Sequence, residues 1–288
     1  MRNYVICTDS ACDISPALLS DWGVCSCELT FRFNDSEKEY SNSNMPIDAF
    51  YNKMREGGVA KTAAVNAEVF KESFKKILDE GSDILYLGFS TGLSTTYNSA
   101  RIAGEELASE YPDAKIITID TLAASAGEGL LVYLAVEKKK TGATIEEAAD
   151  YVKSNIFSLC HWFTVDDLVY LKRGGRISPA AAFFGNLIGI KPVLHVDNEG
   201  HLIAVSKVRG RRGAIMTLAD KFGELAVDKE GGTVFISHGD CIDDANLLAN
   251  TLSERYGATV KIITDVGPVI GAHSGPGTLA LFFIGKNR

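Results

Sequence analysis

The sequence lacks the features that would place a protein in a membrane or send it out of the cell. Its 288 residues contain no run of about 18 apolar residues, so we expect no membrane span and no stable membrane insertion. No apolar secretory segment precedes the first strand-like run. We therefore expect a cytoplasmic protein.

The six cysteines lack the spacing of a metal site. There is no paired C-x-x-C motif and no cluster of cysteine with histidine, so we expect no zinc and no other metal. Cys7 and Cys25 lie in strand-like runs, where buried reduced thiols are common. The other cysteines are Cys12, Cys27, Cys160 and Cys241.

The common catalytic and nucleotide-binding motifs are also missing. The sequence has no G-x-S-x-G elbow, no Walker loop and no G-x-G-x-x-G after its first strand. Residues 125–129, Ser-Ala-Gly-Glu-Gly, resemble a phosphate loop only weakly, and such small residues favour close packing at the start of a helix. The sequence therefore shows no convincing catalytic set, and we expect no cofactor.

Basic residues are fewer than acidic ones, 29 against 37, but they are concentrated in one segment. The formal net charge of −8 argues against nucleic acid as a partner. Residues 172–212 nevertheless contain eight basic and two acidic residues, a local net charge of +6. This segment is either a set of solvated loops or a docking face for a phosphate or an acidic protein.

The first half of the chain alternates short apolar runs with helical segments. Residues 4–8, 84–89 and 116–119 are predicted strands, and residues 25–31 are a further strand-like run. Helical segments of more than about ten residues separate them. This alternation predicts an α/β fold whose parallel sheet is covered on both faces.

Two predicted helices have recognisable first turns. Ser15 followed by Pro16 predicts an N-cap with proline at the first helical position. Thr144 and Glu147 have the spacing of a capping box.

The predicted strands of the first half end in segments rich in hydroxyl groups. Residues 8–10, 90–97 and 120–125 follow three of these strands. Ligands of open α/β sheets bind beyond the carboxyl ends of the strands. The helix after Leu93 also directs its N-terminal N–H groups toward this edge, which favours an anion.

The second half mixes strands and helices without this alternation. We therefore expect two domains, an N-terminal α/β domain of residues 1–156 and a C-terminal α+β domain of residues 157–288. The predicted helices of the second half are 166–172, 211–226 and 243–256, and its predicted strands are 193–196, 234–237, 260–264 and 279–284.

The segment 267–277 combines four glycines and two prolines with His273 and Ser274. Glycine allows a close approach of the backbone to a ligand, and proline fixes turns. The segment is either a rigid holder for a polar group or a surface turn before the last strand.

Three side chains could meet if the two halves of the chain close together. Thr62, Ser94 and His273 would form a hydrogen-bonding cluster suited to an anion. A serine beside a histidine also allows nucleophilic catalysis, for which Asp9 or Asp120 would be the orienting carboxylate. The residues alone leave both interpretations open.

Several motifs taken together resemble the DegV family. This family comprises bacterial fatty-acid-binding proteins, among them the FakB subunits of fatty acid kinase. The resemblance spans nearly the whole chain. Its motifs are Thr8-Asp9-Ser10, Ser90-Thr-Gly-Leu-Ser94-Thr-Thr-Tyr97, Leu171-Lys-Arg-Gly-Gly-Arg176-Ile177, Ile190-Lys191-Pro192 and residues 267–277.

The resemblance implies a two-domain DegV fold with one long-chain fatty acid between the domains. The carboxylate would bind to the N-terminal domain, through Thr62 and Ser94, and the acyl chain would enter a tunnel in the C-terminal domain. His273 would complete the hydrogen-bond network, as a donor that orients the head group rather than as a general base. Arg176 and Arg209 match family arginines associated with the site or with the kinase partner.

Two departures from the family pattern fall beside these residues. The family often has Thr-Ser-Gln-Pro where this chain has Thr62-Ala-Ala-Val65, and often glycine where this chain has Thr95. Thr62 and Ser94 are retained, and Thr95 joins the expected ligand-binding residues.

The acyl chain would supply most of the binding free energy. About fifteen carbons at ~0.8 kcal/mol per CH₂ give roughly 12 kcal/mol before association costs. The donors at the carboxylate chiefly offset its desolvation and fix its orientation. Candidate tunnel residues are Phe183, Phe184, Leu187, Ile188 and 281–284.

The leading hypothesis, which rests on the resemblance, is a carrier that is not an enzyme and binds a fatty acid such as palmitate, stearate or oleate. It would present the carboxylate to an ATP-dependent fatty acid kinase subunit, which makes the acyl phosphate. The alternative is a hydrolase of acyl esters or thioesters that uses Ser94 and His273. A third hypothesis is a sensor whose lipid occupancy controls a protein contact.

Overall fold

A parallel sheet forms the centre of the N-terminal part of the chain. The computed structural model describes residues 2–177 and 189–288. Its first sheet has the order β2 (Val24–Cys27), β1 (Tyr4–Asp9), β6 (Asp83–Gly88) and β7 (Ile116–Asp120), with every neighbouring pair parallel. The strands predicted over 4–8, 84–89 and 116–119 are confirmed.

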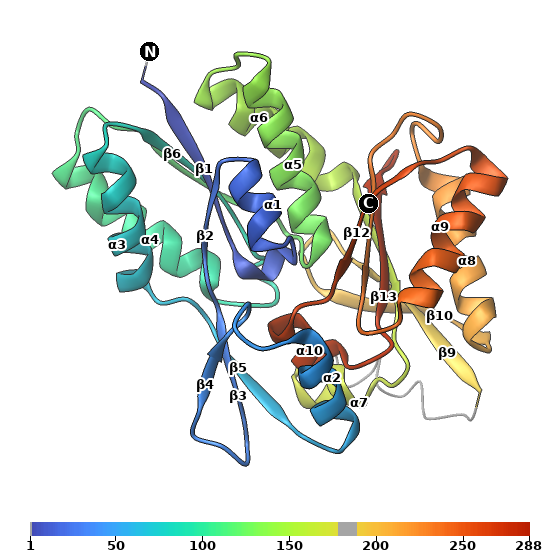
Figure 1. Ribbon diagram of the computed structural model, residues 1–288. Coiled ribbons are helices and arrows are strands. Elements are labelled where there is room, and N and C mark those ends of the chain that lie inside the picture. The colour runs from blue at the N-terminus through green and yellow to red at the C-terminus, as the bar shows by residue number, and fades with distance from the viewer. Residues whose placement is uncertain (1, 178–188) are drawn as a thin grey trace.

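Helices cover both faces of this sheet (Figure 1). One face packs against α3 (Ala67–Asp79) and α4 (Thr96–Glu110). The other packs against α1 (Pro16–Asp21), α5 (Ala126–Lys140) and α6 (Ile145–Asn155). The predicted α/β architecture is therefore confirmed for this part of the chain.

Both predicted helix starts are also confirmed. The Ser15 hydroxyl accepts a hydrogen bond from the Leu18 N–H at the start of α1, where Pro16 is the first helical residue. Thr144 and Glu147 form a complete capping box at the start of α6. A short 3₁₀ turn, η1 (Ser10–Cys12), follows β1.

The strand predicted over residues 25–31 is wrong, because the chain divides it between two sheets. After β2 the chain turns, and the Leu29 N–H donates to the Ser10 hydroxyl at 2.9 Å. The chain then enters a small antiparallel sheet, which the sequence did not predict. This sheet has the order β4 (Glu39–Ser41), β3 (Thr30–Phe33) and β5 (Ala60–Ala63), and α2 (Ile47–Arg55) lies between β4 and β5 in the chain.

The C-terminal part is built on a mixed six-stranded sheet. Its neighbouring strands are antiparallel except for the last pair, which is parallel. This confirms the mixed character expected of the second half. The order is β10 (Leu202–Arg209), β9 (Ile190–Val196), β8 (Leu159–Thr164), β13 (Leu279–Ile284), β11 (Val234–His238) and β12 (Val260–Asp265).

The two sheets share α5. One face of the six-stranded sheet packs under α8 (Arg211–Leu225) and α9 (Ile242–Tyr256). The other face brings Phe235 and Phe282 into the same core as the buried residues of α5. In Figure 1, α5 accordingly lies between the N-terminal sheet and the C-terminal strands. The two parts meet through this helix, and the chain passes from one to the other through η2 (Ile156–Ser158).

Two short helices lie where the N-terminal and C-terminal parts meet, α7 (Val169–Arg173) and α10 (Pro268–Ser274). The segment 267–277 is thus mainly a helix, whereas the sequence suggested a loop or turn. Pro268 occupies its first turn, and Gly275 ends it with a φ of 81°. Proline starts helices well and glycine ends them, so the same residues that suggested a turn delimit a helix.

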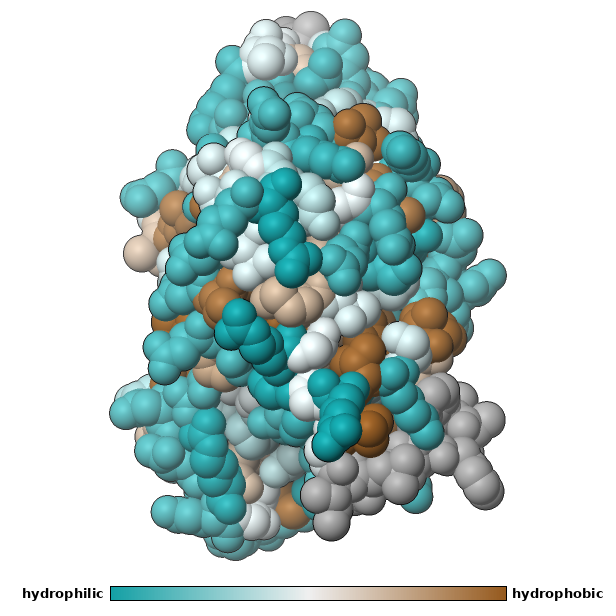
Figure 2. All heavy atoms as spheres, turned by 90° about the vertical axis from the view of Figure 1, so that its right-hand side faces the viewer, coloured by the Kyte–Doolittle hydropathy of each residue, from teal (hydrophilic) through white to brown (hydrophobic). Residues whose placement is uncertain are grey.

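Figure 2 shows a mainly hydrophilic face on the side of α8 and α9, with apolar residues in small separate groups. Within residues 2–177 and 189–288, every helix is too short or too polar to cross a bilayer.

Candidate functional site

A cavity of about 580 Å³ lies between the two parts of the chain. Residues from the N-terminal elements and from the C-terminal sheet, α7 and α10 contribute to its wall. Most of the wall is apolar, and its larger apolar side chains are Leu29, Phe89, Leu93, Phe163, Leu171, Val196, Leu202, Val266, Val269, Ile270 and Phe282.

Thr62 and His273 meet at this wall although 211 positions separate them in the chain. Thr62 is on β5 and His273 is on α10. The Thr62 Oγ1 and His273 Nε2 atoms are 2.9 Å apart, a hydrogen-bonding distance. The predicted approach of these two side chains is therefore observed.

The His273 ring is neutral near physiological pH. Burial lowers its pKa to about 4, and the positive charge of Arg176 acts in the same direction. The ring also packs tightly on Gly174, where an added Cβ would lie only 2.2 Å from Nδ1. A neutral, fixed imidazole supplies one N–H donor and one acceptor, and Nε2 is the atom that faces Thr62.

Ser94 and Thr95 lie at the N-terminus of α4 and line the same cavity. The Ser94 Oγ accepts a hydrogen bond from the Thr96 N–H at 3.2 Å and lies 2.9 Å from the Thr96 Oγ1. Thr95 is exposed, so this end of the cavity is close to the surface. The first N–H groups of a fifteen-residue helix favour negative charge here.

Arg176 also lines the cavity, and its guanidinium is fixed by backbone carbonyls. Nε donates to the Leu93 carbonyl at 3.2 Å, and Nη1 donates to the Gly174 carbonyl. Burial lowers its pKa, but an arginine keeps its charge at neutral pH. Arg176 therefore places a positive charge beside the head of α4.

Arg209 is the one predicted site residue that lies away from the cavity. It is exposed at the end of β10 and is not in the cavity wall. The five predicted residues that line the cavity together are Thr62, Ser94, Thr95, Arg176 and His273.

The predicted tunnel wall is partly wrong. Of residues 281–284, only Phe282 lines the cavity, while Leu281 and Phe283 belong to the core under α8 and α9. Successive residues of a strand face opposite sides of its sheet, so β13 could not give all four to one wall. Phe183, Phe184, Leu187 and Ile188 lie outside the described residues.

Comparisons with known proteins agree with this architecture. Residues 3–286 match the family model described as "Uncharacterised protein, DegV family". A DegV domain-containing protein of Clostridium perfringens is 43% identical over 289 residues, covering 100% of this chain and 99% of the relative. The chain belongs to the DegV family.

Two other DegV relatives have names that state a ligand. A fatty acid-binding protein of Thermotoga maritima is 35% identical, with 95% of each chain covered. A crystal structure of a DegV lipid-binding protein from the same organism has a TM-score of 0.87 at 32% identity and covers 99% of both chains.

In this DegV protein, a buried series of hydrogen-bonded side chains reaches the cavity wall, and the sequence did not predict it. The Ser125 hydroxyl donates to Asp13 Oδ2 at 2.5 Å and lies 2.9 Å from the Ser237 hydroxyl. Ser125 and Ser237 both line the cavity. Burial raises the pKa of Asp13 to about 7. Only Ser125 carried a signal, since it ends one of the hydroxyl-rich segments.

Asp13 and Asn42 of the N-terminal part hold the start of α10. The Gly267 N–H donates to Asp13 Oδ1 at 3.0 Å, and the Val269 N–H donates to Asn42 Oδ1 at 2.8 Å. An added Cβ on Gly267 would lie 2.6 Å from the Asn42 amide nitrogen, so glycine permits this approach. The helix that carries His273 is thus fixed from the opposite half of the molecule.

The two carboxylates that the sequence suggested for orienting His273 accept hydrogen bonds from other groups, and His273 Nδ1 has no hydrogen-bond partner among the described residues. The Asp9 carboxylate is buried and accepts from the Tyr86 hydroxyl and the Phe89 N–H. Asp120 accepts from Thr91. Within the described residues, Ser94, His273 and a carboxylate therefore do not form a hydrogen-bonded triad.

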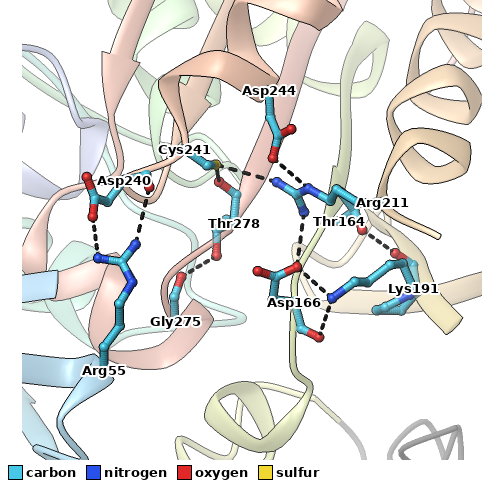
Figure 3. Close-up of polar contacts among 11 residues, drawn as sticks. Arg55, Thr164, Asp166, Lys191, Arg211, Asp240, Cys241, Asp244, Gly275 and Thr278 are labelled. Carbon is cyan, nitrogen blue, oxygen red and sulfur yellow. Dashed lines mark hydrogen bonds and ion pairs between the residues drawn. The ribbon is translucent and has the colours of Figure 1, made fainter. Parts of the chain in front are cut away.

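The basic residues of segment 172–212 lie in three different environments: ion pairs, the cavity wall and the exposed surface. Figure 3 shows Arg211 between Asp244 and Asp166, with Lys191 also on Asp166. Arg176 faces the cavity. The exposed cations of the segment include Lys172, Arg173, Arg209 and Arg212.

Proposed function

We propose that this DegV protein binds one long-chain fatty acid in the cavity between its two parts. The contact between Thr62 and His273, in a mainly apolar cavity that Ser94 also lines, carries this proposal. It is supported by the two Thermotoga maritima relatives, whose names state fatty acid binding and lipid binding.

The polar residues suit a carboxylate rather than a neutral head group. The hydroxyls of Thr62 and Ser94 can donate to its oxygens, and the neutral His273 ring orients them. Arg176 and the N-terminus of α4 add positive potential. The N-terminal domain, residues 1–156, would thus supply most carboxylate contacts, and residues 157–288 would hold most of the acyl chain.

The proposal extends to a fatty acid such as palmitate, stearate or oleate that is phosphorylated by a separate kinase. Thr95 is exposed, so the carboxylate would lie close to the surface, within reach of a partner's phosphoryl donor. The exposed cations Lys172, Arg173, Arg209 and Arg212 would form part of the docking face for that ATP-dependent subunit.

The double variant Thr62→Ala with Ser94→Ala tests the carboxylate assignment. We expect protein purified from a bacterial host to carry one fatty acid per chain by native mass spectrometry. Loss of two charge-assisted hydrogen bonds, each about 1.5–3 kcal/mol, should weaken binding by at least about a hundredfold. Ser99→Ala is the control, since Ser99 lies on α4 but does not line the cavity.

Three outcomes would each reject a different part of this account. Unchanged lipid retention in the double variant would remove the carboxylate assignment. Labelling of Ser94 by a serine-reactive phosphonate, abolished in His273→Ala, would favour the hydrolase instead. Failure of every kinase to phosphorylate the bound lipid would reject the kinase partnership but leave binding intact.

A further inference from the structure

A cluster of three cysteines lies on the N-terminal sheet, outside the cavity. Cys7 on β1 and Cys25 on β2 are register partners in the parallel pair. Cys27 follows two residues later and therefore faces the same side, toward α3. None of the three lines the cavity.

The strand register makes Cys7 the natural disulfide partner of Cys25. Register partners on adjacent strands are about 4.8 Å apart, within the roughly 4.4–6.8 Å between Cα atoms that a disulfide spans. Cys27 lies two residues along the strand from Cys25, at about 6.6 Å, near the limit of that range.

The surroundings of Cys25 favour the thiolate. Its Sγ lies 3.4 Å from the Ser73 hydroxyl on α3. A hydrogen bond from Cys7, the Ser73 hydroxyl and the nearby positive charge of Lys76 lower the pKa of Cys25 to about 6, against burial, which raises it. The same contact and burial raise the pKa of Cys7 well above its usual value. The pair thus combines one thiolate with one thiol.

The two thiols also differ in access. β2 is the edge strand of its sheet, and Cys25 is half-buried. Cys7 is on the inner strand β1 and is only 1% exposed. Cys25 is therefore the more accessible of the two thiols, and Cys7 is shielded from solvent.

We propose that Cys25 and Cys7 form a redox-active pair in which Cys25 reacts with a hydroperoxide and Cys7 resolves the product. The Cys25 thiolate attacks the terminal peroxide oxygen, the O–O bond breaks, and the leaving alkoxide or hydroxide takes a proton. This gives a sulfenic acid and an alcohol or water. The Cys7 sulfur then attacks the Cys25 sulfur, the S–O bond breaks, and the two thiols are joined as a disulfide with release of water.

The test uses the full chain, reduced and then treated with equimolar hydrogen peroxide near neutral pH. Peptide mass spectrometry should find a Cys7–Cys25 disulfide, with two hydrogens lost. Cys7→Ser should stop at a Cys25 sulfenic acid that dimedone traps, and Cys25→Ser should form no disulfide at the cluster. Cys27→Ser should form the disulfide as the wild type does.

Cys241 is the internal comparison for reactivity. It is also half-buried, but burial raises its pKa to about 11. In the native protein, iodoacetamide should alkylate Cys25 faster than Cys241 by on the order of a hundredfold, because the larger thiolate fraction outweighs the lower nucleophilicity. Equal alkylation rates, or a Cys25–Cys27 disulfide in place of the Cys7–Cys25 bond, would overturn the proposal.

Discussion

At the scale of single residues, the site depends on how closely Gly174 and His273 pack. No side chain fits at position 174, because a Cβ would lie 2.2 Å from His273 Nδ1. The glycine therefore fixes the ring whose other nitrogen reaches Thr62. The sequence showed the histidine but could not show this contact, since Gly174 lies almost a hundred positions away, in another motif.

Replacing Gly174 by alanine should displace the His273 ring and weaken the proposed ligand hydrogen bond. Loss of one such bond, about 1.5 kcal/mol, corresponds to about a tenfold weaker affinity for oleate. Gly213→Ala is the control, since its added Cβ would meet nothing closer than 4.0 Å. Equal affinities of the two variants in a fluorescent fatty-acid displacement assay would contradict this role.

The buried His273 ring should also make the protein less stable in acid. Its pKa falls from 6.5 to about 4 on folding, so the unfolded chain binds the proton more tightly. The stability that this neutral ring contributes is complete above pH 6.5 and is lost as the pH falls from 6.5 toward 4. At low pH, burial of the neutral ring should thus lower the free energy of unfolding by up to about 3 kcal/mol.

His273→Gln isolates this effect from the other titrating groups. The difference in unfolding free energy between the variant and the wild type should shift by about 2–3 kcal/mol in favour of the variant between neutral pH and pH 4. Urea titrations at several pH values measure it, and parallel curves for the two proteins would show that folding leaves the pKa of the His273 ring unchanged.

At the scale of elements, α10 is the part of the site that sequence patterns described least well. Its glycines and prolines suggested a turn, yet residues 268–274 form a helix held by Asp13 and Asn42. These partners are more than 220 positions away, so no local pattern records them. The ends of the parallel strands were easier to predict, because a buried strand followed by hydroxyl-rich residues is a local signal.

Asn42→Ala should loosen the start of α10. The Val269 N–H would lose its acceptor, at a cost of about 1–2 kcal/mol, as in the loss of a helix cap. We expect a lower melting temperature and faster release of bound fatty acid. Asn44→Ala is the control, since Asn44 is in the same turn and donates only its backbone N–H to the Ser41 carbonyl in the described contacts. Release at the wild-type rate would contradict the anchoring role.

At the scale of the whole molecule, the function proposed here depends on two parts that close on one cavity. Both sheets pack against α5, and the Arg55–Asp240 ion pair joins α2 to the loop after β11 (Figure 3). The sequence predicted the two-part α/β architecture and five of the residues that line the cavity. It could not separate Arg209, on the surface, from Arg176, at the cavity, because the resemblance assigned both arginines and only their tertiary positions differ.

A crystal structure of the protein with oleate tests the central claim most directly. We expect the carboxylate within hydrogen-bonding distance of Thr62, Ser94 and His273, with the acyl chain directed past Phe282. A carboxylate beside Ser125 and Ser237, with the acyl tail at Thr62, would contradict the assignment. A cavity that stays free of lipid at saturating oleate would contradict the proposed function itself.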